Sequence, residues 1–195
     1  MEHPLSCACG TLKGVVRQGK GRGICYCRDC QAFARFLGRP AEILDTSGGT
    51  DVVATLARYV TIAEGHQALA CMSLGPRGLQ RWYARCCNTP IGNTLRDRRL
   101  PYVGLVHSCL NSTGQDLDDA FGPARMRVNT DSAIGTPKPG ATPLRAALAI
   151  ARTGTALAAA RISGGYRRTP FFDASGEPVV QPTVLTREER VSLNA

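Results

Sequence analysis

Cysteine is the residue whose number and spacing in this chain can support chemistry. Most of the nine cysteines fall into three clusters, which are Cys7 and Cys9, then Cys25, Cys27 and Cys30, then Cys86 and Cys87. In an extended segment, residues i and i+2 project to the same face, so a Cys-x-Cys pair can present two sulfurs to one ion. Zinc suits such a set because it accepts tetrahedral thiolate shells and has no redox chemistry of its own. The clusters therefore predict a zinc protein.

The three clusters can be grouped into two sites. Neighbouring side chains on a strand face opposite ways, so Cys86 and Cys87 can reach one metal only if the backbone turns there, as the following Asn-Thr-Pro sequence permits. We expect this pair to join Cys7 and Cys9 in a closed structural site. The Cys-x-Cys-x-x-Cys cluster is then a three-sulfur site with an open position. A redox pair within that cluster is the alternative, but it needs a thioredoxin-like βαβ context, which the glycine-punctuated strands predicted around it do not supply.

The remaining cysteines and the histidines stand apart from these clusters. Cys71 and Cys109 lie alone in apolar runs, so we predict that they are buried core thiols rather than ligands. His3, His66 and His107 are also isolated along the chain. They predict no dedicated catalytic acid or base, and the chemistry is expected from sulfur.

The composition narrows the class of protein. A chain of 195 residues with 43% hydrophobic content can bury its own core. An odd number of cysteines cannot pair completely, and the first residues lack the pattern of a secretory signal, so we expect a protein of the reducing cytoplasm. No run reaches the roughly 18 apolar residues of a membrane span. Although the net charge is +9, the basic residues are dispersed and aromatics are only 6%, so nucleic acid is not expected as a partner.

Short strands are predicted to position the clusters. Residues 1–125 contain apolar runs punctuated by glycine, including LKGVV, DVVATLARYVTI, LQRWYA and YVGLVH, which predict strands. The segment GKGRG at 19–23 lacks the Lys followed by Ser or Thr of a phosphate loop, and we predict that it is a hairpin tip. Residues 1–125 are therefore expected to form a mainly β, zinc-binding domain.

Residues 126–195 are predicted to form an extension with a linker and one main helix. Residues 129–143 are rich in Gly, Pro, Thr and Ser, and the Thr-Pro pair at 142–143 marks a helix start, so the helix is expected at about 142–163. An apolar stripe on this helix is predicted to pack on the β domain, with pairing to a second copy in a homodimer as the alternative. The stripe consists of Leu144, Leu148, Ala151, Ala158 and Ile162. The sequence TREE at 186–189 predicts a capping box that starts a last short helix.

The order of these clusters resembles that of a known enzyme family. A Cys-x-Cys-Gly, a Cys-x-Cys-x-x-Cys and a later cysteine pair ahead of a Thr-Pro turn are similar to the glutathione-dependent formaldehyde-activating enzymes, which include the relatives of centromere protein V. The resemblance covers roughly residues 5 to 110. It implies an Mss4-like, β-tent fold, in which small antiparallel sheets are stapled by zinc. By position, the first cysteine pair matches the structural ligands of that family, and the Cys-x-Cys-x-x-Cys cluster matches its ligand-responsive site.

The chain also departs from the family pattern. The family usually carries Cys-x-x-Cys-Gly at the later cluster, whereas this chain has Ala84 in place of the first cysteine and Asn88 in place of the glycine. Cys87 carries over, and Cys86 is proposed as the substitute ligand. If Cys86 faces away, His107, Cys109 or Cys71 would complete the shell. The segment after about residue 125 has no counterpart in the basic family pattern.

The resemblance implies an activity and a partner. The activity is that of a carbon–sulfur lyase, which joins a glutathione-type thiol to a small aldehyde as an S-hydroxymethyl adduct, with Cys25, Cys27 and Cys30 as catalytic ligands. One structural Zn²⁺ is expected, with a second at this cluster. The carboxylates of such a thiol could be met by Arg17, Lys20, Arg22 and Arg28. The alternative is a non-catalytic, zinc-stabilised module that binds a partner protein.

Overall fold

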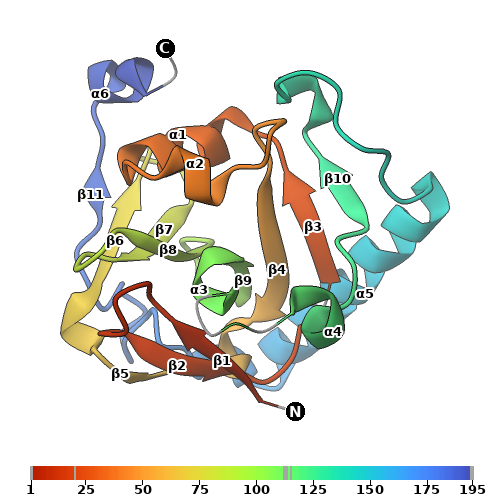
Figure 1. Cartoon of the computed structure of the whole chain (residues 1–195). Helices are drawn as coiled ribbons and strands as arrows, with labels where there is room; N and C mark the ends of the chain where they lie inside the picture. Colours follow the sequence, from red (N-terminus) through yellow and green to blue (C-terminus); the bar gives the residue numbers. More distant parts are fainter. Residues whose placement is uncertain (1, 20, 112–113, 115, 194–195) are drawn as a thin grey trace.

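Two sheets make up the β structure of the chain (Figure 1). The computed structural model describes residues 2–19, 21–111, 114 and 116–193. The smaller sheet has three antiparallel strands in the order β1 (His3–Ser6), β2 (Lys13–Val16) and β5 (Val60–Glu64). The larger sheet has eight strands in the order β10 (Met126–Val128), β3 (Gly21–Cys25), β4 (Thr50–Leu56), β9 (Tyr102–Val106), β8 (Thr89–Thr94), β7 (Gln80–Ala84), β6 (Leu69–Ser73) and β11 (Thr183–Val184).

Helices occupy as much of the chain as strands do, at about 31% and 29%. The α-helices are α1 (Arg28–Phe36), α2 (Pro40–Ile43), α3 (Ser108–Asn111), α4 (Leu117–Phe121), α5 (Pro143–Ile162) and α6 (Arg187–Ser192). Short 3₁₀ helices at Ala57–Tyr59, His66–Ala68, Thr130–Ser132 and Gly165–Arg167 make up the rest. The architecture is thus mixed α/β with antiparallel sheets, and the expectation of a mainly β chain is corrected. Among the described helices, none combines the length and apolarity that crossing a membrane requires.

Helix α1 explains part of that correction. Its N-cap is Cys27, whose sulfur accepts the backbone N–H of Cys30, so the usual Ser, Thr, Asp or Asn start signal is missing from the sequence. The helix buries Ala32 and Phe33 against the rest of the molecule, and apolar burial of this kind stabilises it more than intrinsic propensity does. Because a candidate metal ligand, Cys27, serves as the N-cap, the sequence carries no ordinary start signal for α1.

The predicted hairpin tip GKGRG at 19–23 is wrong. Strands β2 and β3 belong to different sheets, so the chain between them crosses from one sheet to the other and GKGRG is not a hairpin tip. Gly23 lies within β3, where a Cβ atom would approach the Cβ of Met126 to 2.8 Å. Glycine is therefore needed at this position for β10 to pair alongside β3.

The C-terminal segment supplies the edge strand at each side of the large sheet. Strand β10 pairs in parallel with β3, and β11 pairs in parallel with β6 at the opposite edge. Phe171 is fully buried, and its ring centroid lies 5.0 Å from that of the core residue Trp82. Residues after 125 thus contribute to the same core as the strands that precede them.

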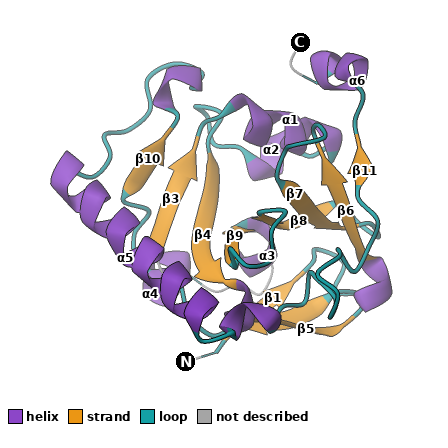
Figure 2. Ribbon diagram, turned by 180° about the vertical axis from the view of Figure 1, so that it is seen from behind, coloured by secondary structure: helices purple, strands orange, loops and turns teal. Residues whose placement is uncertain are grey.

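Helix α5 spans Pro143–Ile162 as predicted, and the capping box at Thr186 and Glu189 starts α6. Figure 2 shows α5 running beside β10 and β3. The predicted packing stripe is wrong, because Leu144, Leu148 and Ile162 are exposed at 71%, 56% and 87%. The face turned to the protein carries smaller side chains and includes the buried Ala160. Since α5 has apolar residues on several faces, periodicity alone does not select the buried one.

Candidate metal centres

The first candidate centre is formed by four cysteines, which we call the tetrad: Cys7, Cys9, Cys86 and Cys87. Their sulfur atoms all lie within 4.8 Å of one another, although they come from the turn after β1 and the turn between β7 and β8. Gly10 and Asn88 adopt left-handed backbone conformations, with φ of 75° and 51°, and so allow these two turns to reverse direction. The predicted convergence of these clusters is confirmed.

The spacing of the tetrad sulfurs matches a metal shell. A tetrahedral zinc site with Zn–S bonds of about 2.3 Å places its sulfurs about 3.8 Å apart. The sulfur of Cys7 lies 3.6 Å from that of Cys9 and 3.8 Å from that of Cys86, and the sulfurs of Cys86 and Cys87 are 3.8 Å apart. A disulfide would bring two sulfurs to about 2.05 Å, and all four thiols are free. The sulfur of Cys86 therefore faces the cluster.

Neighbouring groups fix the tetrad. The Leu12 N–H donates to the sulfur of Cys7 at 3.2 Å. Thr89 Oγ1 lies 3.1 Å from the sulfur of Cys87 and accepts the Ala8 N–H at 3.0 Å. Arg39 Nη1 donates to the carbonyl oxygen of Cys87 at 2.7 Å. These bonds tie the two turns together, as outer-shell contacts do at metal sites.

The protonation of the tetrad thiols is uneven. The hydroxyl and backbone of Thr11 lower the pKa of Cys9 to about 6. Burial raises the pKa of Cys86 to about 12 and also raises that of Cys7. Without a metal, the cluster therefore holds thiols and thiolate together, and a divalent cation would displace the remaining protons.

The second candidate centre, which we call the triad, contains Cys25, Cys27 and Cys30. Their sulfurs also lie within 4.8 Å of one another. Cys25 ends β3, Cys27 caps α1 and Cys30 lies in the first turn of that helix. The strand-to-helix turn thus gathers the three sulfurs, and hydrogen bonds from the thiols of Cys27 and Cys30 lower the pKa of Cys25 to about 2.

Two residues that the sequence analysis missed contact the triad. Asn129 Nδ2 donates to the sulfur of Cys25 at 3.4 Å. Arg81 is buried, and its Nη1 lies 4.0 Å from the sulfur of Cys30 and 3.2 Å from Asn93 Oδ1. A buried guanidinium offsets the negative charge that three thiolates bring to the site. These contacts bridge 104 and 51 residues of sequence, so no local pattern could reveal them.

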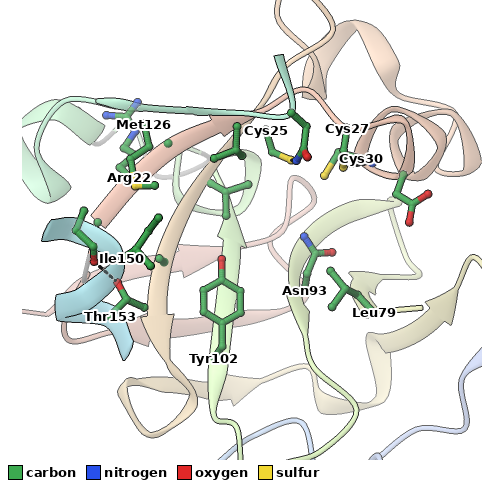
Figure 3. A pocket seen from close by; sticks show the side chains of 18 of the residues that line it. Arg22, Cys25, Cys27, Cys30, Leu79, Asn93, Tyr102, Met126, Ile150 and Thr153 are labelled. Atoms are coloured by element: carbon green, nitrogen blue, oxygen red, sulfur yellow. Dashed lines mark hydrogen bonds between the residues drawn. The ribbon is translucent and has the colours of Figure 1, made fainter. Parts of the chain in front are cut away.

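A cavity of about 540 Å³ opens beside the triad (Figure 3). All three triad cysteines line it, and its other walls come from β3, β4, β9, β10 and α5. Tyr102 stands on β9 with its hydroxyl pointing into this space, as Figure 3 shows, and among the described residues that hydroxyl has no hydrogen-bond partner. Burial, together with the negative charge of Cys25 and Cys30, raises the pKa of Tyr102 to about 12, so its hydroxyl stays a donor.

The predicted cationic residues lie at different distances from this cavity. Only Arg22 lines it, and its guanidinium binds Asp51 Oδ2 at 2.6 Å as well as Asp118. Arg17 pairs with Glu2 at 2.8 Å, next to the small sheet. Arg28 is exposed on α1 and does not line the cavity, and Lys20 lies outside the described residues.

The isolated cysteines are core residues, as predicted. Cys71 and Cys109 are buried and belong to neither sulfur group. Burial raises the pKa of Cys71 to about 12 and raises that of Cys109 still further. Both therefore remain thiols at neutral pH, and neither is needed to complete the tetrad.

A family model matches most of the chain. The model of a family of unknown function (DUF6151) matches residues 2–181. This range includes both sulfur groups and all the residues that line the cavity. No curated protein matches the chain. The match does not assign the chain to the formaldehyde-activating enzymes, so function must be argued from the site itself.

Proposed function

The chain belongs to DUF6151, a family of unknown function, and we propose that it is a zinc protein with one closed and one open thiolate centre. The tetrad is the closed site and stabilises the fold. The triad is the open site, which takes a small thiol as fourth ligand and supports carbon–sulfur bond formation with an aldehyde. The resemblance of the cysteine order to formaldehyde-activating enzymes supports this reaction class.

The observation that carries the proposal is the position of the triad on the wall of a cavity. Structural zinc sites have four protein ligands, whereas reactive sites keep a position for substrate. The triad offers three sulfurs and faces a space of about 540 Å³, within the usual range of small-molecule sites. The tetrad has four ligands and no such need of an external one.

The charge of the triad favours a thiol over water. Three thiolates and Zn²⁺ carry a net charge of −1, which makes the metal a weaker Lewis acid than one bound by three histidines. Bound zinc would lower the pKa of an incoming thiol and hold it as a thiolate. Arg81 lies against Cys30 and balances the added negative charge.

The proposed reaction is the addition of a thiol to the carbonyl group of an aldehyde. The thiol loses its proton on entering the site, its sulfur forms a bond to the aldehyde carbon, and the carbonyl π bond becomes an oxyanion that takes up one proton. The product is an S-hydroxyalkyl thioether, with no net oxidation or reduction. The Tyr102 hydroxyl, which points into the cavity, would donate a hydrogen bond to the developing oxyanion.

The identity of the thiol is a separate question. Glutathione is the thiol that the resemblance implies. Its two carboxylates would need cations, and Arg22 already binds Asp51 and Asp118. The resemblance therefore supports the reaction class more directly than it supports glutathione itself.

Calorimetry on zinc-loaded protein tests this proposal. Addition of a small thiol should release heat with a stoichiometry of one per chain, and that heat should vanish in Cys27→Ser, which removes one triad ligand. Cys71→Ala is the matched control, because Cys71 is a buried thiol outside both groups. Retained zinc with no thiol-dependent heat in the unaltered protein would overturn the proposal.

A non-catalytic interaction module is the second candidate. The exposed side chains of Leu144, Leu148 and Ile162 on α5 favour it, because an exposed apolar helix face can bind a partner protein or a second copy of the chain. None of the nine cysteines, all within the described residues, forms a disulfide, and this agrees with a reducing cytoplasmic setting under either function.

A further inference from the structure

The C-terminal segment builds one wall of the triad cavity. Met126 and Val128 line it from β10, and Ala149, Ile150 and Leu157 line it from α5. Ile150 is 62% exposed and so lies toward the mouth. The wall is attached beside the triad itself, since Tyr26 donates its N–H to the carbonyl oxygen of Val128 at 3.0 Å.

The charged groups of this cavity are already paired. Arg22 binds Asp51 and Asp118. Arg81 Nη2 lies 4.0 Å from Asp29 Oδ2, and Arg190 Nη2 lies 2.8 Å from the other oxygen of the same carboxylate. Among the described lining residues, no charged side chain stands unpaired and ready to meet a ligand carboxylate.

The rest of the lining is mainly apolar. It includes Val52, Ala54, Leu79, Met126, Val128, Ile150 and Leu157. Of the polar side chains in the lining, Asn93 and Tyr102 face the space between the apolar residues and the triad (Figure 3). The Thr153 hydroxyl donates to the carbonyl oxygen of Ala149, and the Asn129 amide to the sulfur of Cys25. A ligand here would have a polar end near the sulfurs and a longer apolar part against the C-terminal wall. The cavity is also far larger than a one-carbon aldehyde requires.

We infer that the triad takes a thiol bearing an apolar chain rather than glutathione, and that β10 and α5 form the wall which binds this chain. The inference rests on the proposed function, because it names the thiol class of the open site. The thiol sulfur occupies the open position, and its chain lies along Met126, Leu157 and Ile150. Each buried CH₂ group then adds about 0.8 kcal/mol, or roughly fourfold in affinity.

Gly154 provides a means of testing this wall. It lines the cavity from α5, and a Cβ atom built on it meets nothing within 4 Å. Gly154→Leu would fill part of the cavity without a backbone clash. Leucine is also a better helix former than glycine, so the variant is expected to fold. Ala151→Leu adds the same side chain to the exposed face of the same helix and is the matched control.

The experiment is calorimetry of the zinc-loaded full chain with ethanethiol, propanethiol, butanethiol and glutathione. Butanethiol, with two more CH₂ groups, should bind roughly 15-fold more tightly than ethanethiol, and more tightly than glutathione. In Gly154→Leu this advantage should fall below about threefold while the zinc content is unchanged, and Ala151→Leu should keep the full advantage.

Two other results would overturn the inference in distinguishable ways. Equal affinities along the series, or glutathione binding more tightly than butanethiol, would overturn the apolar-chain inference while leaving a thiol-binding triad. If no thiol gives heat that Cys27→Ser abolishes, the proposed function fails together with the inference.

Discussion

The side-chain amide of Asn129 lies 3.4 Å from the sulfur of Cys25, across 104 residues of sequence. Asn129 adopts a left-handed conformation with φ of 56°, directly after β10, and this turns its amide back toward the triad. The contact joins the C-terminal segment to the candidate metal centre. It makes that segment part of the site.

Asn129→Asp is predicted to weaken metal binding at the triad. The carboxylate would replace an amide donor with a negative charge beside a thiolate, and loss of an outer-shell contact typically costs 10- to 100-fold in metal affinity. The measurement is competition with a chromophoric chelator. Asn129→Gly is the matched variant, because glycine can keep the left-handed backbone conformation and the change removes the amide without adding charge. It should lose less metal affinity than Asn129→Asp. Equal metal affinity in all three proteins would contradict this role.

Arg81→Met is predicted to destabilise the protein and the triad together. Arg81 is 2% exposed, contacts Asn93 and Cys30, and its guanidinium lies 5.3 Å from the ring centroid of Phe33. Loss of the Arg81 side chain should lower the free energy of unfolding by about 2 kcal/mol. This is less than the cost of breaking a fully buried ion pair, because Asp29 is 39% exposed. Urea unfolding measures this cost. Arg81→Lys keeps the charge and should recover part of the metal affinity; a lysine variant no better than the methionine variant would exclude a charge effect.

Cys86→Ser is predicted to remove the metal of the tetrad. The sulfur of Cys86 lies 3.3 Å from that of Cys9, whereas Cys71 and Cys109 are buried outside the tetrad. Metal content should fall by about one ion per chain, and loss of roughly 3 kcal/mol would lower the melting temperature by about 10 °C. Cys71→Ala should retain both ions. Full metal content in Cys86→Ser would show that Cys86 is not needed as a ligand of the tetrad metal.

Metal affinity of the tetrad is predicted to fall with acidification. Burial raises the pKa of Cys86 to about 12 and also that of Cys7, so both thiols are protonated at pH 7 without metal and must lose their protons on binding. The pKa of Cys9 is about 6, so this group is already largely ionised at pH 7. The pKa of Cys87 is also lowered by its hydrogen bond with Thr89. Release of at least the two protons of Cys7 and Cys86 per ion gives a fall in affinity of about 100-fold or more for each unit that the pH is lowered. Chelator competition between pH 7 and 8 measures how metal affinity changes with pH. An affinity that does not change over this range would contradict the protonated states of Cys7 and Cys86.

Local patterns predicted the groups of residues that lie close along the chain. Cysteine spacing gave the three separate clusters, and the Thr-Pro pair gave the start of α5, because each depends on a few neighbouring residues. Joining two clusters into the tetrad across 79 residues needed the further requirement of a four-ligand shell. Arg81 and Asn129 escaped prediction since their contacts with the triad are set by strand pairing far along the sequence. The start of α1 was missed because Cys27 takes the place of an ordinary N-cap residue. The inward face of α5 was missed because it carries Ala149, Leu157 and Ala160, whereas Leu144 and Leu148 of the predicted stripe are exposed.

The metal content of the purified chain tests the central claim most directly. Protein that has never met a chelator should contain about two zinc ions per chain, and X-ray absorption should show shells dominated by sulfur at about 2.3 Å. A correctly folded protein that contains no metal would contradict the account.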